Sequence, residues 1–231
     1  MKETVMTIEL DPATLNAPTV RVVVAGYTGR NEAAVRHHID ELARIGVAPP
    51  ENVPEFYPMP SGTLSFGETT AVTGTQTSGE VEPVLIRLAG RYYLTVGSDH
   101  TDREHEAISI AESKQRCPKP LSATALPVEF GQLESAWDSI QLTTTVDGVA
   151  YQSGSAAALR PLTETLRLLQ QREGLDGGED LVLFGGTVPL LTGDFQYGTH
   201  WELALRTPEA SLGLTYRTAV TAPEGAAHAQ G

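Results

Sequence analysis

The sequence is poor in basic residues and in cysteine, and it contains no long apolar segment. Its 16 lysine and arginine residues stand against 29 aspartate and glutamate residues, so the formal net charge is −13. A chain with this excess of negative charge repels phosphate groups, which argues against binding nucleic acid or an anionic membrane by bulk electrostatics. No apolar run approaches the roughly 20 residues needed to span a bilayer. We therefore expect a small molecule or another protein as the partner.

The scarcity of cysteine and the character of the N-terminus indicate the compartment. Cys117 is the single cysteine and cannot form a disulfide within the chain, which agrees with a reducing compartment. Residues 1–18 lack the basic and apolar regions of a signal peptide. We expect a cytoplasmic protein.

The length of 231 residues suits one well-buried domain. We expect residues 1–65 to form a strand, a helix and a proline-rich lid region, and residues 66–220 to form the core. Residues 221–231 are small and polar, which predicts a disordered tail.

Apolar periodicity predicts more strand than helix. A helix is expected over Asn31–Ile45, where Asn31 can cap the first turn, and a second helix is expected to begin at Pro161 and end at Gly174. Residues 47–65 contain five prolines and should be irregular or extended. Strands are predicted at Thr19–Ala25, Leu142–Val146, Val149–Gln152, Leu181–Phe184, Thr199–Leu205 and Gly213–Val220.

The most informative pattern is a predicted hairpin that carries acidic residues at its open end. Val84–Leu88 and Tyr92–Val96 are β-branched and aromatic runs separated by Ala89 and Gly90, which is typical of a tight turn. With that turn Leu88 faces Arg91, so the residue numbers of each facing pair sum to 179 and Asp99 falls opposite Glu80. Because side chains alternate along a strand, Glu80, Glu82 and Asp99 should share one face.

Three carboxylates on one face repel one another and need a cation. An all-oxygen set of this kind suits a hard divalent metal ion. A solvated polar strand face is the alternative, because Glu-x-Glu is a common pattern. His100 should point away from Asp99, and we do not expect it to be a ligand.

The ordered set of motifs resembles the fumarylacetoacetate hydrolase superfamily, and more closely a bacterial family catalogued as a domain of unknown function. The resemblance extends from about Val20 to Val220. The segments that carry it are Tyr27 with His38–Glu41, Glu80–Glu82, Ser98–Glu104, Ser113–Lys114 with Cys117–Pro120, Gln152–Ser155, and Gly185–Pro189 with Gly193–Asp194.

This resemblance implies an α+β, sheet-rich fold, a mixed β-sandwich or roll with peripheral helices. It implies that Glu80, Glu82 and Asp99 bind Mg²⁺ or Mn²⁺, with Ca²⁺ as an alternative. Lys114 and Thr187 would contact the substrate, and the protein would form a homodimer. The substrate would be a small oxo-acid or diketone.

Five further residues receive roles from the sequence. His38 and Glu41 lie three apart on the predicted helix, so a histidine oriented by a carboxylate could activate water, although an exposed helix face is an equal alternative. Arg103 could bind a substrate carboxylate, but bracing Asp99 or Asp102 is the role we favour. Tyr27 and Gln152 are expected at the substrate by the resemblance.

The activity expected is hydrolytic cleavage of a carbon-carbon bond next to a carbonyl. Decarboxylation of a 2-oxo acid or keto-enol tautomerisation is the first alternative, because it needs no attacking water. A non-catalytic binding or scaffold protein of the same fold is the second. Its support is the altered motif at Asp102 and the absence near Pro58 of a lysine that the superfamily often carries.

Overall fold

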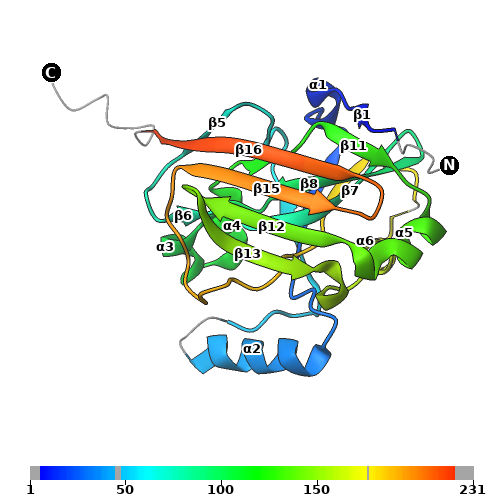
Figure 1. The fold of residues 1–231 in the computed structure, drawn as a ribbon. Helices are drawn as coiled ribbons and strands as arrows, with labels where there is room; N and C mark the ends of the chain where they lie inside the picture. The colour runs from blue at the N-terminus through cyan, green and yellow to red at the C-terminus, as the bar shows by residue number, and fades with distance from the viewer. Residues whose placement is uncertain (1–5, 45–47, 176, 222–231) are drawn as a thin grey trace, which may run out of the picture.

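The computed structural model describes residues 6–44, 48–175 and 177–221. A seven-stranded mixed sheet forms its centre (Figure 1). In order across the sheet its strands are β1 (Ile8–Glu9), β11 (Thr124–Pro127), β8 (Arg91–Ser98), β7 (Val81–Leu88), β14 (Leu181–Phe184), β2 (Arg21–Gly26) and β3 (Glu55–Met59). The segment before residue 66 thus supplies two long strands, β2 and β3, to the same sheet as the core hairpin.

A second, five-stranded sheet lies in front of β7 and β8 in Figure 1. Its strands in order are β13 (Val149–Ser155), β12 (Gln141–Val146), β15 (His200–Arg206), β16 (Ser211–Val220) and β5 (Thr69–Val72). Two short pairs complete the strands of the described residues: β10 (Lys119–Pro120) with β4 (Leu64–Ser65), and β6 (Thr77–Ser78) with β9 (Thr101–Asp102). The architecture is the α+β, strand-rich fold that the sequence predicted.

Two apolar clusters cover the two faces of the large sheet. The first joins it to the five-stranded sheet: Leu85 and Val96 pack there with Leu203 and Trp201. The second lies on the opposite face and includes Val84 and Phe184. Burying both faces explains why β7 is apolar at nearly every position after Glu82 rather than alternating.

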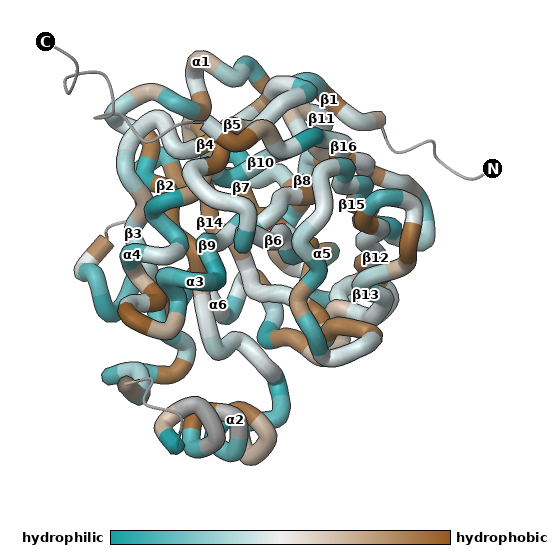
Figure 2. The backbone as a smooth tube through the Cα atoms, turned by 90° about the vertical axis from the view of Figure 1, so that its left-hand side faces the viewer, coloured by the Kyte–Doolittle hydropathy of each residue, from teal (hydrophilic) through white to brown (hydrophobic). Residues whose placement is uncertain are grey.

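The helices lie around the sheets, and α2 stands apart from them. Their bounds are α1 (Pro12–Leu15), α2 (Glu32–Arg44), α3 (Arg103–Glu106), α4 (Ile110–Gln115), α5 (Phe130–Ala136) and α6 (Leu162–Glu173), with 3-10 turns at Trp137–Ser139 and Ala156–Ala158. The predicted helix after Pro161 is confirmed as α6, and Gly174 ends it in the left-handed conformation. Both views place α2 below the rest of the molecule (Figure 1, Figure 2).

The register of the acidic hairpin agrees with the sequence prediction. Ala89 and Gly90 both have positive φ, 48° and 75°, as a type I′ turn requires. Leu88 pairs with Arg91, and Val81 pairs with Ser98 at the open end. The turn therefore fixes which face every later residue of β7 and β8 presents.

The proline-rich segment is extended in β3 and β4 and irregular over the rest of its described residues. Residues 55–59 form β3, an edge strand that pairs with β2 alone, so Pro58 needs no second partner. Ile45, the expected last residue of the helix before this segment, and the tail beyond residue 221 lie outside the described residues. No helix in the part of the chain that the structure describes is long and apolar enough to cross a membrane.

Candidate active site at one edge of the large sheet

Strand directions bring five chain segments to one edge of the large sheet. β7 runs antiparallel to β8 and to β14, while β14 and β2 run parallel. The start of β7 therefore lies beside the ends of β8, β14 and β2 and the start of β3. The predicted carboxylates occupy this edge, together with the turn that follows β14.

Glu82 and Asp99 lie on the face that carries the second apolar cluster, and Glu80 is next to them at the sheet edge. Glu82 pairs with Gly97, and the backbone N–H of Asp99 donates to the carbonyl of Glu80 at 3.0 Å, so the ladder continues past the strand ends. Asp99, two residues beyond Gly97, shares the face of Glu82. The shared face predicted from the hairpin is present for Glu82 and Asp99, and the carboxylate of Glu80, beside them at the sheet edge, pairs with Arg103.

Two lysines neutralise Asp99. The Lys114 ammonium contacts Oδ2 of Asp99, and the Lys119 ammonium lies 3.1 Å from Oδ1. Burial alone would raise the pKa of Asp99, but these ammonium groups outweigh it and hold the pKa below its usual value. Asp99 is therefore a carboxylate at neutral pH although only 1 % of it is exposed.

Lys119 is a buried cation that the sequence prediction missed. It is 0 % exposed, and besides Asp99 it donates to the backbone carbonyls of His100 and Lys114. The sequence contains three lysines, and two of them lie on this one aspartate. That scarcity is the signal that could have identified Lys119, together with its position between Pro118 and Pro120.

Arg103 braces a carboxylate, but a different one from those expected. Its Nη2 lies 2.9 Å from Oε2 of Glu80, and its Nη1 lies 3.0 Å from Glu106. Its Nε donates to the hydroxyl of Ser78 at 2.8 Å. We expected Arg103 to brace Asp99 or Asp102, but in the structure it braces Glu80. The reason is that α3 begins at Arg103, and the side chain of this residue turns back toward Ser78 in β6.

Asp102 has its own partners. Its carboxylate accepts from the backbone N–H of His105 at 3.0 Å as the cap of α3, and from Nε of Arg116 at 2.7 Å. Asp102 thus anchors α3 and the end of α4, where Lys114 lies.

Glu82 carries the strongest sign that the set suits a cation. It is 3 % exposed, and Oε2 accepts a hydrogen bond from the backbone N–H of Gly186 at 2.9 Å. Burial first, and then the charges of Asp99 and of Glu80, raise its pKa well above its usual value, although Lys114 and the Gly186 N–H act in the other direction. A divalent cation would relieve this repulsion.

The donor set therefore fits a hard divalent ion in charge and in ligand type. Within the described residues, no group of three or more His, Cys, Asp or Glu is already placed to hold one.

Gln152 and Thr187 hold the backbone between the two glutamates. Oε1 of Gln152 accepts from the N–H of Val81 at 2.9 Å, and the hydroxyl of Thr187 donates to the carbonyl of Val81 at 2.8 Å. Nε2 of Gln152 also donates to the Thr187 hydroxyl and to the carbonyl of Val188. Both side chains position Glu80 and Glu82 from the opposite face, and their contact with substrate stays a prediction.

Tyr27 lies beside a cavity that adjoins Glu80, Glu82 and Asp99, which we call the acidic cluster. It has a positive φ of 56° and follows Gly26, where a Cβ would approach Tyr57 Cε2 to 2.8 Å. Tyr27 and Tyr57 line a cavity of about 420 Å³, and the Lys114 ammonium lies 5.6 Å from the centre of the Tyr57 ring. Glycine at position 26 allows Tyr57 to pack here.

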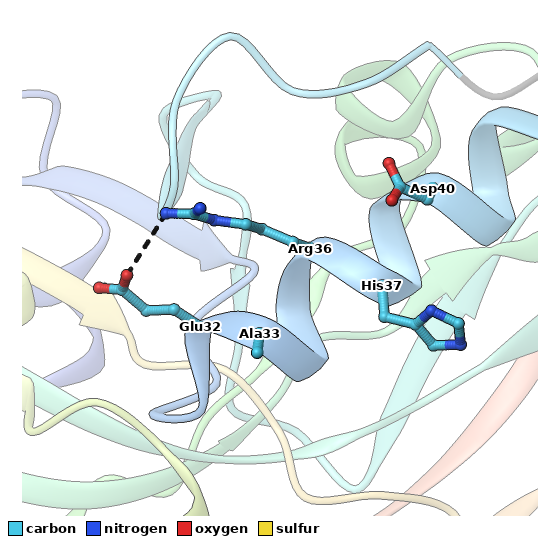
Figure 3. A pocket seen from close by; sticks show the side chains of 5 residues that line it. All are labelled: Glu32, Ala33, Arg36, His37 and Asp40. Atoms are coloured by element: carbon cyan, nitrogen blue, oxygen red, sulfur yellow. Dashed lines mark ion pairs between the residues drawn. The ribbon is translucent and has the colours of Figure 1, made fainter.

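The predicted water-activating pair lies on α2. His38 and Glu41 belong to that helix, and their side chains lie outside the described part of the structure. Figure 3 shows a separate hollow along α2, and Glu32 pairs there with Arg36 at 3.6 Å. It is lined by Glu32, Ala33, Arg36, His37 and Asp40, none of which belongs to the acidic cluster.

His100 and Cys117 are both buried. The ring nitrogens of His100 bond the hydroxyls of Tyr216 and Thr77, each at 2.9 Å. Burial lowers the pKa of His100 to about 3 and raises that of the Cys117 thiol to about 11. His100 faces the five-stranded sheet, away from the carboxylates.

Removing the Lys119 cation should destabilise the fold strongly. We expect Lys119→Met to lower the free energy of unfolding by about 3–5 kcal/mol, because Asp99 and two carbonyls lose a buried partner. Urea unfolding measures the change, and Arg91→Met in the exposed hairpin turn is the matched control. A loss below about 1 kcal/mol, no more than an exposed ion pair contributes, would contradict this role.

Comparison with known proteins places the chain in a family. Residues 25–216 match the family described as "Protein of unknown function (DUF2848)". A search of curated protein sequences returned no match.

Solved structures share the fold at low sequence identity. A protein from Mycobacterium smegmatis assigned as HpcE has a TM-score of 0.62 at 18 % identity, covering 89 % of this chain and 76 % of its own. One from Oleispira antarctica, assigned as a fumarylacetoacetate isomerase/hydrolase, has a TM-score of 0.61 at 16 % identity, with coverages of 87 % and 93 %. One from Burkholderia cenocepacia, assigned as a fumarylpyruvate hydrolase, has a TM-score of 0.56 at 16 % identity, with coverages of 93 % and 95 %. The chain has the fumarylacetoacetate hydrolase-like fold and belongs to the DUF2848 family.

Proposed function

We propose that the protein is a divalent-metal-dependent hydrolase that cleaves a carbon-carbon bond next to a carbonyl in a small oxo-acid or diketone. The observation that supports this most is the convergence of Glu80, Glu82 and Asp99 at one sheet edge beside a cavity. The names of the similar structures include hydrolases and an isomerase, which agrees with this class of chemistry.

Glu80, Glu82 and Asp99 are the residues proposed to hold the ion, which would be Mg²⁺ or Mn²⁺, with Ca²⁺ as an alternative. When bound, such an ion polarises a carbonyl and stabilises negative charge on an enolate. The buried, mutually repelling carboxylates supply hard oxygen ligands. Arg103 holds Glu80 in place through a 2.9 Å ion pair.

Lys114 is proposed to bind the substrate. Its ammonium contacts Asp99 and lies over the Tyr57 ring, between the acidic cluster and the cavity. As a compact positive charge it can pair with a substrate carboxylate or with an enolate oxygen. Tyr27, on the same cavity, would contact the substrate from the side of β2.

Hydrolysis also needs an activated water. We assign this role to His38, oriented by Glu41, because a histidine titrates near neutral pH and can accept the proton of water. Both residues lie on α2, which would act as a lid. The resemblance to the fumarylacetoacetate hydrolase superfamily leads us to propose a homodimer, and the single cysteine leads us to propose a cytoplasmic location.

Removing two of the proposed ligands should abolish activity and metal retention together. We expect Glu80→Gln with Glu82→Gln to lose the bound ion and turnover of acylpyruvates, because both carboxylate charges are gone. Metal analysis after purification and a coupled pyruvate assay measure the two effects. Glu104→Gln with Glu209→Gln, at exposed positions, is the matched control. Full activity in the first double variant would defeat the proposal.

The rival chemistry, decarboxylation or tautomerisation, differs in needing no attacking water. We expect His38→Ala to lower kcat by about 10²–10⁴-fold, the usual contribution of a general base, while the metal content stays unchanged. His37→Ala, the neighbouring histidine, should have little effect. Unchanged turnover in His38→Ala would favour the rival reaction.

A further inference from the structure

The cavity beside the acidic cluster has mostly apolar walls. It encloses about 420 Å³ between β3, the loop before it, and the segment that joins α3 to α4. Its lining residues are Tyr27, Ala48, Pro49, Pro50, Glu51, Glu55, Phe56, Tyr57, Pro58, Glu106, Ala107, Ile108, Ser109, Ile110 and Ala111. Aromatic rings, prolines and aliphatic side chains form most of this surface.

Two shared residues join this cavity to the acidic cluster. Tyr57 lines the cavity and lies beneath the Lys114 ammonium, which contacts Asp99. Glu106 lines the cavity and pairs with Arg103, which holds Glu80. A molecule bound to Lys114 by one end therefore has this cavity within reach of its other end.

The charge of the lining restricts what can enter. Its charged side chains are Glu51, Glu55 and Glu106, and the described lining residues include no arginine or lysine. Burial raises the pKa of Tyr27 and of Tyr57, so both phenols stay neutral. Arg103 pairs with Glu106, but a second carboxylate here would still meet Glu51 and Glu55, with no lysine or arginine of the lining to bind it, whereas an uncharged apolar group would meet apolar walls.

We propose that this cavity selects oxo-acids whose far end is an uncharged apolar group, aryl or branched alkyl. The proposal rests on the proposed function for the position of the reacting end. Hydrolysis of such an acylpyruvate adds water across the carbon-carbon bond and gives pyruvate and the apolar carboxylic acid. The segment from Ala107 to Ala111 is then a specificity element.

The test compares two substrates that differ at the far end. Benzoylpyruvate carries an apolar ring, and succinylpyruvate carries a second carboxylate. We expect kcat/KM for benzoylpyruvate to exceed that for succinylpyruvate about tenfold or more, the scale of discrimination that pocket contacts give. An equal or reversed preference would overturn the proposal.

A positive charge placed in the cavity should remove this preference, because it would pair with the second carboxylate of succinylpyruvate. Ile108 is 77 % exposed, so Ile108→Lys should fold normally. We expect it to lower the benzoylpyruvate to succinylpyruvate ratio of kcat/KM about tenfold. Val149→Lys, the same change of charge at the 66 % exposed first position of β13, should leave the ratio unchanged. An unchanged ratio in Ile108→Lys would contradict the assignment of this cavity.

Calorimetric binding of the same two compounds separates the two proposals. If neither compound is hydrolysed but benzoylpyruvate binds more tightly than succinylpyruvate, and Ile108→Lys removes the difference, the cavity proposal stands and the proposed reaction fails. If neither compound is hydrolysed or bound, both proposals fail.

Discussion

The arrangement of this sheet edge depends on the compensation of buried negative charge. Asp99 and Glu82 are almost completely buried, and an uncompensated carboxylate in such a place costs several kcal/mol. The fold places Lys114 and Lys119 on Asp99 and Arg103 on Glu80. These contacts tie α3, α4 and β10 to the end of the hairpin.

The negative charges of Asp99 and Glu82 are not compensated equally, and this difference determines where the site can bind a further cation. Both oxygens of Asp99 have a lysine, whereas Glu82 accepts one backbone hydrogen bond and keeps a raised pKa. The cluster is thus most ready to accept further positive charge at Glu82. Lys114, which connects this cluster to the cavity, is the group best placed to recognise an anionic substrate.

Local signals predicted the hairpin, and long-range contacts explain what was missed. The Ala89–Gly90 turn sets the register by itself, so the shared face of Glu82 and Asp99, and the position of Glu80 opposite Asp99, followed from alternation alone. The bracing of Glu80 by Arg103 depends on how α3 turns back, which no periodicity records. The cavity unites β3 with the α3–α4 segment, about 50 residues further along the chain.

Diffraction from crystals grown with Mn²⁺ tests the central claim most directly, because the anomalous signal locates the ion. The account predicts a peak bound by carboxylate oxygens of Glu80, Glu82 and Asp99, with Arg103 still paired to Glu80. Two results would contradict the account: a fully occupied manganese site elsewhere in the molecule, or no manganese peak at this edge, where the lysines would then be the only cations beside Asp99.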